Sequence, residues 1–247
     1  RDQRDQVLIT PPESLEIQKE VLKVILNHLH EFYPDLYSIN NEYVEVFKNN
    51  EVLNFSDYKN PIELASLLVQ EDLIIMKPNQ DIFQLESASL CAPTRWSLKD
   101  KFRKSLTAIH KEVPGYKEKI DSRVNNIFRN LPNHKIFERF NWSIFDSPEL
   151  FQPVSNKSAV EINNIDPEKL FIRVERQTLR RLEASQCVLF AVRVHVDPIS
   201  SILKSQEAIY DLIKALENLD NDMKTYKVIK PFEKNLMNWL KSRAINE

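Results

Sequence analysis

His110, Gly115 and Tyr116 form the segment of this sequence in which residue types and spacing first suggest chemistry. His110 ends an apolar helical pattern, and Gly115, the only glycine among the 247 residues, stands directly before Tyr116. Glycine allows positive φ and lets a bulky group approach the backbone closely. A neutral imidazole is a common metal ligand. The segment therefore predicts a ligand-binding turn in which His110 is the metal-ligand candidate and Tyr116 supplies a nearby hydroxyl.

Simpler explanations compete with this hypothesis. Histidine is also favoured at the C-terminal end of a helix by the helix dipole, whether or not it binds anything. Cys91 is a rival thiolate ligand, although a cysteine at the end of an apolar strand is ordinarily a small buried hydrophobe. His195 ends a strand pattern, where solvent contact is as common as a pocket. The two cysteines lack Cys-x-x-Cys spacing, so a zinc site or a disulfide framework has little support.

A second cluster of polar residues lies in a strand pattern. Strand periodicity sorts it into two rows on opposite faces, with Arg173, Glu175 and Gln177 in one row and Arg176, Thr178 and Arg180 in the other. Arginine binds carboxylates in pairs through its planar fork, and a glutamate in a pocket can hold a cationic amine or relay a proton. A solvated ladder of salt bridges explains the cluster equally well. The segment Arg139-Phe-Asn-Trp142 presents the same two alternatives.

The elements that position these residues follow from hydrophobic periodicity and turn signals. Helical spacing predicts helices over residues 10–33, 60–70, 97–109, 116–131, 201–219 and 231–243. Strand patterns cover residues 72–76, 82–91, 137–145, 170–179 and 187–196, and residues 152–166 have the character of a long loop. In the last strand, Arg193 and His195 share one side, so this half meets a polar environment and is expected to form a pocket wall. Gln70-Glu71-Asp72 has the character of a solvated helix boundary.

Two strands, then helices, then three strands is the order of a PAS scaffold, although other α+β folds share it. We predict an α+β fold in which helices pack on a PAS-like antiparallel five-stranded sheet, with helical extensions at both ends. Residues 1–60 are expected to form the N-terminal helical extension. Residues 61–247 are expected to form the PAS-like domain together with the C-terminal helices.

Composition limits the partners. Hydrophobic residues make up 42% of the chain and charged residues 28%, and the net charge of −2 comes without any isolated basic block. Duplex nucleic acid is therefore not expected as a partner. No apolar run approaches the roughly 20 residues of a membrane span, and Arg1–Gln6 lacks the pattern of a signal peptide. We expect a cytoplasmic protein with no membrane partner.

Four blocks carry a family resemblance: Leu68-Val-Gln-Glu-Asp72, Pro93-x-x-Trp96 leading to Ile109-His-x-x-Val-Pro-Gly-Tyr116, Arg139-x-Asn-Trp142, and Arg173-Val-Glu-Arg-Gln-Thr-Leu-Arg-Arg-Leu182. In this order the sequence resembles the haem-dependent oxidative N-demethylase α-subunit-like family over about residues 60 to 240. It departs from the family at two turns. Arg103 stands where the family usually has Gly, and Glu183 and Gln186 replace a Pro and a Gly between the last two strands.

The resemblance implies a haem-binding PAS-like domain. The iron ligand would be His110, the catalytic residue Glu175, and the cofactor-binding residues His110, Tyr116, Arg139, Arg173 and Arg176. The haem would be b-type and non-covalent, because Cys-x-x-Cys-His is absent. The family's characterised enzyme oxidises dimethylamine with O₂, using electrons from NADPH through a reductase that carries FMN and an iron–sulfur cluster. We therefore expect a small methylated amine and O₂ as substrates, and a separate flavin/iron–sulfur reductase subunit as partner.

Two other functions remain open. The same pocket could hold haem without turnover, as a non-catalytic haem-binding PAS-like sensor or a haem-handling protein. Alternatively, the domain could have lost haem and act only in assembly. The sequence has no pattern of a separate output domain, which favours a stand-alone enzyme or subunit.

Overall fold

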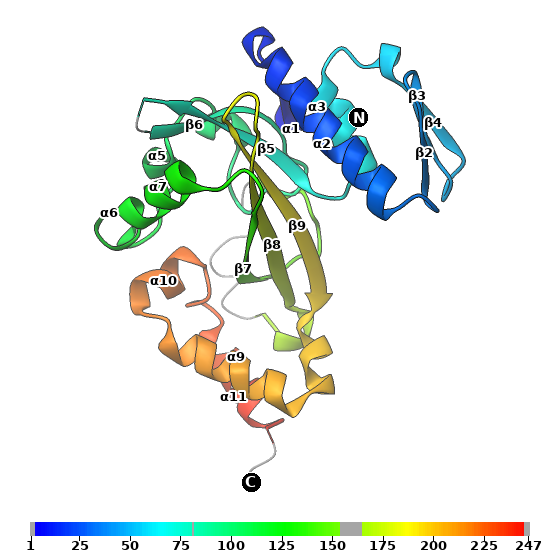
Figure 1. Cartoon of the computed structure of the whole chain (residues 1–247). Coiled ribbons are helices and arrows are strands. Elements are labelled where there is room, and N and C mark those ends of the chain that lie inside the picture. The colour runs from blue at the N-terminus through cyan, green and yellow to red at the C-terminus, as the bar shows by residue number, and fades with distance from the viewer. Residues whose placement is uncertain (1–2, 81, 154–164, 245–247) are drawn as a thin grey trace.

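The main sheet is six-stranded and antiparallel, with strand order β1-β6-β5-β9-β8-β7 (Figure 1). The structure is a computed structural model that describes residues 3–80, 82–153 and 165–244, so most of the loop predicted over residues 152–166 lies outside it. The strands are β1 (Leu8–Ile9), β5 (Asp72–Asn79), β6 (Ile82–Ser89), β7 (Ile136–Phe145), β8 (Phe171–Arg181) and β9 (Val188–Pro198). Each predicted strand is therefore present and the α+β class is confirmed.

The predicted number of strands in this sheet was wrong. The sixth strand, β1, pairs with β6 through Leu8↔Ser89 and Ile9↔Ala88. Two residues are too few to show the alternation by which a strand is recognised in a sequence. The N-terminal segment thus supplies one strand of the main sheet.

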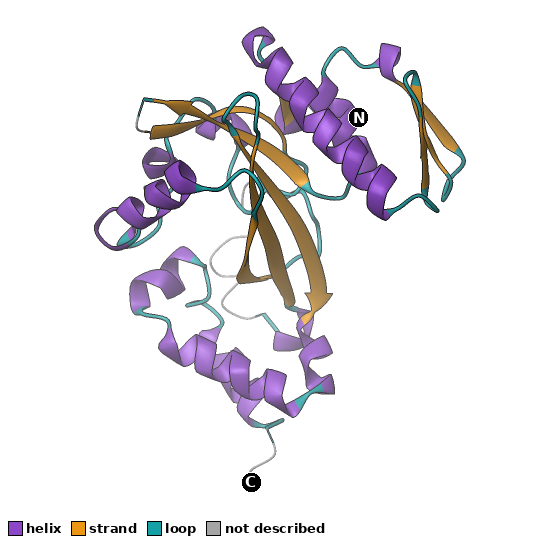
Figure 2. Cartoon of the chain, in the orientation of Figure 1, coloured by secondary structure: helices purple, strands orange, loops and turns teal. Residues whose placement is uncertain are grey.

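The segment before residue 60 also contains a second sheet, so its description as a helical extension was incomplete. It comprises α1 (Arg4–Val7), η1 (Pro12–Ser14), α2 (Leu15–Phe32), β2 (Tyr37–Ile39), β3 (Tyr43–Val46), β4 (Glu51–Asn54) and η2 (Phe55–Asp57), and α3 (Pro61–Leu68) follows. Figure 2 shows the three-stranded sheet β2-β3-β4 standing beside α2, away from the main sheet. Ile17 and Val21 of α2 pack with Ile62 of α3 and with Leu73 of β5, which joins this segment to the core.

Strand register sorts the side chains of the main sheet onto two faces. Arg139, Gln177 and Val192 are cross-strand neighbours on what we call the inner face. Val192 packs in one cluster with Leu106 and Phe128, so α5 (Leu106–Ile109) and α7 (Asp121–Asn130) cover this face together with α4 (Leu98–Lys101). The opposite, outer face is covered near β5 by α2 and α3. Figure 1 shows these two helical layers on either side of the sheet.

The C-terminal helices cover the far end of the sheet. They are η3 (Pro167–Lys169), η4 (Ile199–Lys204), α9 (Gln206–Asn218), α10 (Asn221–Tyr226) and α11 (Glu233–Lys241). Ile144 of β7 packs in their core with Ile199 and Leu216. Lys227, directly after α10, donates to the Trp142 carbonyl at 2.5 Å and lies 5.2 Å from the centre of its ring. This contact fixes α10 beside β7.

The single helix predicted over residues 97–109 is two helices, α4 and α5, separated by a turn. Arg103 in this turn has φ +57°. Its N–H donates to the Leu85 carbonyl, and the Leu85 N–H donates in return to the Lys104 carbonyl. Pairing with β6 thus replaces the helical hydrogen bonds that the apolar spacing predicted. Likewise, the helix predicted over residues 116–131 is divided into α6 (Tyr116–Lys119) and α7.

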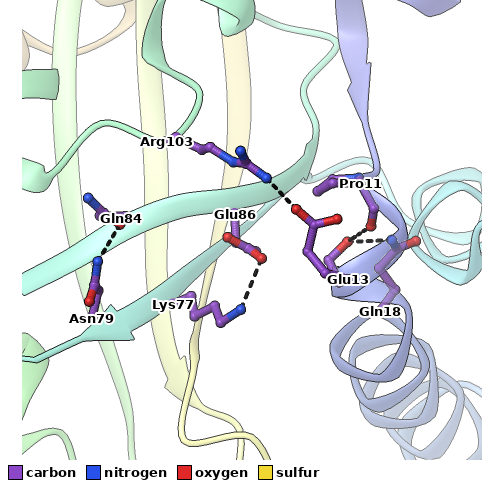
Figure 3. Close-up of polar contacts among 9 residues, drawn as sticks. Pro11, Glu13, Gln18, Lys77, Asn79, Gln84, Glu86 and Arg103 are labelled. Atoms are coloured by element: carbon purple, nitrogen blue, oxygen red, sulfur yellow. Dashed lines mark hydrogen bonds and ion pairs between the residues drawn. The ribbon is translucent and has the colours of Figure 1, made fainter.

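Both departures from the family pattern include a residue with positive φ. Gln186, like Arg103, has φ +57°, in the region that glycine occupies most easily. An acidic side chain from the N-terminal segment contacts each turn. Glu13 forms an ion pair with Arg103 (Figure 3), and Glu20 accepts from the N–H groups of Ala184 at 2.8 Å and Ser185 at 3.0 Å. The N-terminal segment therefore holds both turns without glycine.

Candidate functional site

His110 lies at the C-terminal end of α5 with one ring nitrogen already engaged. Its Nδ1 is 2.8 Å from the Leu106 carbonyl oxygen. Because a carbonyl only accepts, Nδ1 carries the proton and Nε2 keeps its lone pair. Nε2 makes no hydrogen bond with any residue in the described ranges. A hydrogen bond from the other ring nitrogen commonly fixes a metal-ligating histidine. His110 is therefore oriented, and the lone pair of its Nε2 is free to coordinate a metal.

Tyr116 stacks directly on the imidazole. The ring centroids are 4.6 Å apart and the planes are inclined by 11°. Gly115, at φ +65°, turns the chain back at the start of α6 and so brings Tyr116 to His110. Tyr116 is only 5% exposed, yet its hydroxyl has no hydrogen-bond partner within residues 3–80, 82–153 and 165–244. A buried hydroxyl without a partner costs free energy, which marks a place where a ligand can supply one.

Burial controls the protonation of both rings. It lowers the pKa of His110 below the usual value, and the positive charges of Arg139 and Lys101 lower it further. The imidazole is therefore neutral at neutral pH. Burial raises the pKa of Tyr116 to about 12, so its hydroxyl keeps its proton. Sequence reasoning missed Lys101, whose Nζ donates to the Ile109 carbonyl at 2.8 Å, because lysine in a helical pattern ordinarily lies on a solvated face.

Glu175 lies on the inner face in a network of neutral donors. Its Oε1 accepts from the Thr94 hydroxyl at 2.7 Å, and its Oε2 accepts from the amides of Gln177 at 2.7 Å and Asn141 at 3.3 Å. The side-chain amide oxygen of Asn141, Oδ1, in turn accepts from Lys227 Nζ at 3.4 Å. The carboxylate is thus held at a fixed position, with Lys227 orienting one of its donors.

Electrostatics connect this network to His110. The charge of Arg139 acts on the pKa values of His110, Tyr116 and Lys227. Tyr226 lies at the end of α10, and burial raises its pKa. The negative charges of Glu175 and of Glu112, in the loop after His110, raise this pKa further. The loop after α5, the middle of β7 and β8, and the end of α10 are therefore close enough for their charges to interact, and we treat them as one region. We call it the inner-face site and define it by His110, Tyr116, Arg139, Asn141 and Glu175.

The two arginines expected beside the cofactor have different surroundings. Arg173 is fully buried, and its guanidinium donates to the carbonyls of Ala92 at 2.8 Å, Leu150 at 3.1 Å and Glu149 at 3.2 Å. It fixes two loops at the base of the inner face. Arg176 lies on the outer face in an ion pair with Glu138. The structure therefore brings Arg173, but not Arg176, to the face that carries His110.

Asp72 is buried, so the interpretation of residues 70–72 as a solvated boundary was wrong for this residue. Asp72 is 5% exposed and accepts from the Cys91 N–H at 2.6 Å and from the Ala92 N–H at 3.2 Å. Burial raises the pKa of Asp72 to about 6. The carboxyl group holds the turn that leads to Thr94, the donor to Glu175. At the same turn Cys91 is exposed, so the expectation of a buried hydrophobe there was wrong. Desolvation of the thiol and the charge of Asp72 nevertheless raise the pKa of Cys91, which disfavours a thiolate ligand there.

Two hollows lie near the inner-face site, and neither is lined by His110. Pro93 and Trp96 line a pocket of about 200 Å³ together with Leu90 and Phe151. A larger open hollow of about 590 Å³ lies between α7 and Phe137 of β7. Within the described residues, no three His, Cys, Asp or Glu side chains converge as a metal site. No helix among those residues has the length and apolar character to cross a bilayer.

The four sequence blocks meet in space. Asp72, Thr94, Asn141 and Glu175 come one from each block and are linked through the turn at residues 91–94 and the Glu175 network. A family model described as haem-dependent oxidative N-demethylase, alpha subunit-like, matches residues 1–237. The chain belongs to this family. Because the match begins at residue 1, α2 and the sheet β2-β3-β4 lie within the family sequence, beyond the region in which the four blocks were found.

Proposed function

We propose that the chain binds one b-type haem at the inner-face site with His110 as axial ligand, within a PAS-like fold. We further propose that it acts as an O₂-dependent oxidative demethylase subunit on a small methylated amine. One observation carries this proposal. The bond from His110 Nδ1 to the Leu106 carbonyl leaves Nε2 free, on a ring stacked against Tyr116, whose buried hydroxyl has no partner among the described residues. Family membership supports haem as the group that uses them.

The residues at the site fit haem. His110 Nε2 would hold the iron, and a neutral imidazole is one of the usual axial ligands. Lys101 and Arg139, whose charges both act on His110, would attract the two propionates, and the Tyr116 hydroxyl would donate to the cofactor or to a molecule bound beside it. Arg173 would support the site by fixing its loops. When bound, haem supplies the O₂ binding and oxidation chemistry.

Glu175 would bind the amine. A carboxylate oxygen has two lone pairs, and Oε1 receives one donor, from Thr94, whereas Oε2 receives two. Oε1 therefore retains an acceptor position for the N–H of a protonated amine. The fixed carboxylate would stabilise the charge of the amine and accept its proton.

The experiment is formaldehyde formation from a panel of methylated amines, with O₂, a chemical reductant and parallel haem quantification. We expect Glu175→Gln to lower turnover more than it lowers haem content, and Glu138→Gln on the outer face to change neither. Loss of haem from Glu175→Gln would place this residue in the fold or cofactor network. A haem-loaded, reducible protein that forms no formaldehyde from any amine would favour a haem-binding sensor or haem-handling protein.

A further inference from the structure

The outer face of β7, β8 and β9 carries a group of arginine and apolar side chains that are exposed or, at Arg180 and Arg193, half-buried. We call it the outer patch and define it by Ile136, Glu138, Phe140, Arg176, Arg180, Arg193 and His195. Phe140 is 64% exposed and Ile136 is 58% exposed. Large apolar side chains exposed to this extent, next to arginines, resemble the composition of protein-binding hot spots.

The charges of the outer patch are poorly balanced. Arg176 lies directly opposite Arg193 in the β8–β9 register and opposite Phe140 in the β7–β8 register. Like charges in directly opposed strand positions destabilise a sheet. Glu138 pairs with Arg176, whereas Arg180 and Arg193 form no ion pair with any other described residue. A positive cluster in a chain of net charge −2 therefore favours a negatively charged partner.

The position of the outer patch relates it to the inner-face site. Arg139 and Phe140 are adjacent in β7, as are Glu175 and Arg176 in β8, and their side chains alternate between the two faces. A partner on the outer patch would thus be separated from the inner-face site by a single layer of sheet. The sequence predicted that Arg193 and His195 belong to a pocket wall, whereas the structure places them on this patch, on the opposite face of the sheet from Glu175.

We infer that the outer patch is the docking surface for an acidic electron-carrier protein, an inference that rests on the proposed function. The chain has one glycine and two cysteines, so it has neither a glycine-rich nucleotide loop nor four cysteines for an iron–sulfur cluster. The electrons that the proposed function requires would then be supplied by a partner. In each encounter the reduced carrier would lose one electron, which would reduce ferric iron at the inner-face site.

The test uses a strongly acidic plant-type [2Fe–2S] ferredoxin as probe and basic cytochrome c as contrast. Binding to the full chain is measured by calorimetry at low and high salt, with haem content recorded separately. For wild type we expect binding to ferredoxin that weakens with salt, and little binding to cytochrome c. The double variant Arg176→Glu/Arg193→Glu should lose affinity for ferredoxin by about tenfold or more. The control Lys214→Glu/Lys234→Glu makes the same charge change at exposed residues of α9 and α11 and should retain wild-type affinity.

Several outcomes would overturn the inference. The first is that wild type does not bind ferredoxin, and the second is that both double variants lose the same affinity for ferredoxin. The third is that wild type binds a single-stranded RNA oligonucleotide more strongly than ferredoxin. The fourth is that the chain forms a dimer that the patch variant dissociates. The folding of each variant is checked by circular dichroism. If Arg176→Glu/Arg193→Glu does not fold, Arg176→Gln/Arg193→Gln takes its place, and we expect a smaller loss of affinity for ferredoxin. The binding measurement does not require haem. Patch-dependent binding by a folded protein that takes up no haem on reconstitution would therefore contradict the proposed function alone. Patch-independent binding by a protein that takes up haem would contradict this inference alone.

Discussion

The imidazole of His110 and the phenol ring of Tyr116 lie stacked, with centroids 4.6 Å apart. The stack restrains the tilt of the imidazole, and the bond from Nδ1 to the Leu106 carbonyl restrains its rotation. Two contacts from different segments thus orient His110 before any ligand is present. Preorganisation of this kind reduces the entropy that ligand binding would otherwise cost. The turn at Gly115, with φ +65°, makes the stack possible.

Tyr116→Phe separates a ligand-binding role of the hydroxyl from a packing role. The variant keeps the stacked ring and removes a buried hydroxyl that has no partner in the described part of the chain, so the haem-free protein should gain stability, by about 1 kcal/mol. Haem affinity should fall if the hydroxyl donates to the cofactor. Urea unfolding of the haem-free protein and haem titration measure the two effects.

Tyr37→Phe is the matched control, because the Tyr37 hydroxyl donates to the Leu68 carbonyl at 2.9 Å. We expect this variant to lose about 1 kcal/mol of stability and to keep its haem affinity. A Tyr116→Phe protein that is destabilised and binds haem normally would refute the role we assign to this hydroxyl.

Asp72→Asn should change the pH dependence of stability. Burial raises the pKa of Asp72 from 3.8 to about 6, so its contribution is fully present below pH 3.8 and is lost as the pH rises through about 6. The stability of Asp72→Asn relative to wild type should therefore increase between pH 4 and pH 7.5, by up to about 3 kcal/mol. Unfolding in urea across this range, with exposed Asp222→Asn as control, measures the trend. A difference that is constant with pH would contradict it.

Arg103→Gly tests the strain in the turn between α4 and α5. Glycine at this position removes the strain of the positive φ, which raises the free energy of unfolding. We expect this gain to exceed the two losses, which come from the exposed ion pair with Glu13 and from the greater freedom of the unfolded chain. Lys104→Gly is the control, since this exposed neighbour is not among the residues with positive φ. We expect the Arg103 variant to be the more stable of the two, by about 1 kcal/mol. Equal stabilities in a denaturant titration would show that the turn is unstrained.

Periodicity predicted the parts of this molecule that depend on local pattern. Alternation placed the five long strands and separated the faces of Arg173 and Arg176. It did not show which face would meet His110, because this depends on where α5 and α7 pack. The break at Arg103 was missed because the apolar spacing continues through it, whereas the backbone pairs with Leu85 of β6.

Long-range contacts account for the site residues that the sequence analysis missed. Asp72 is buried because the turn at Cys91 and Ala92, far along the chain, closes over it. Lys227 reaches Asn141 and Trp142 from the C-terminal helices, and a lysine at a helix end gives no local sign of such a contact. The His110 to Tyr116 segment was found because a single glycine identified the turn.

Haem titration of wild type, His110→Ala and His195→Ala, followed by ferric and ferrous absorption spectra, tests the axial ligand most directly. Wild type should saturate near one equivalent of haem and show a Soret band. His110→Ala should lose or strongly alter the axial ligation. His195→Ala changes a residue on the outer face, and its spectra should match those of wild type. Wild-type spectra from the His110 variant, or no Soret band from folded wild type after reconstitution, would contradict the account.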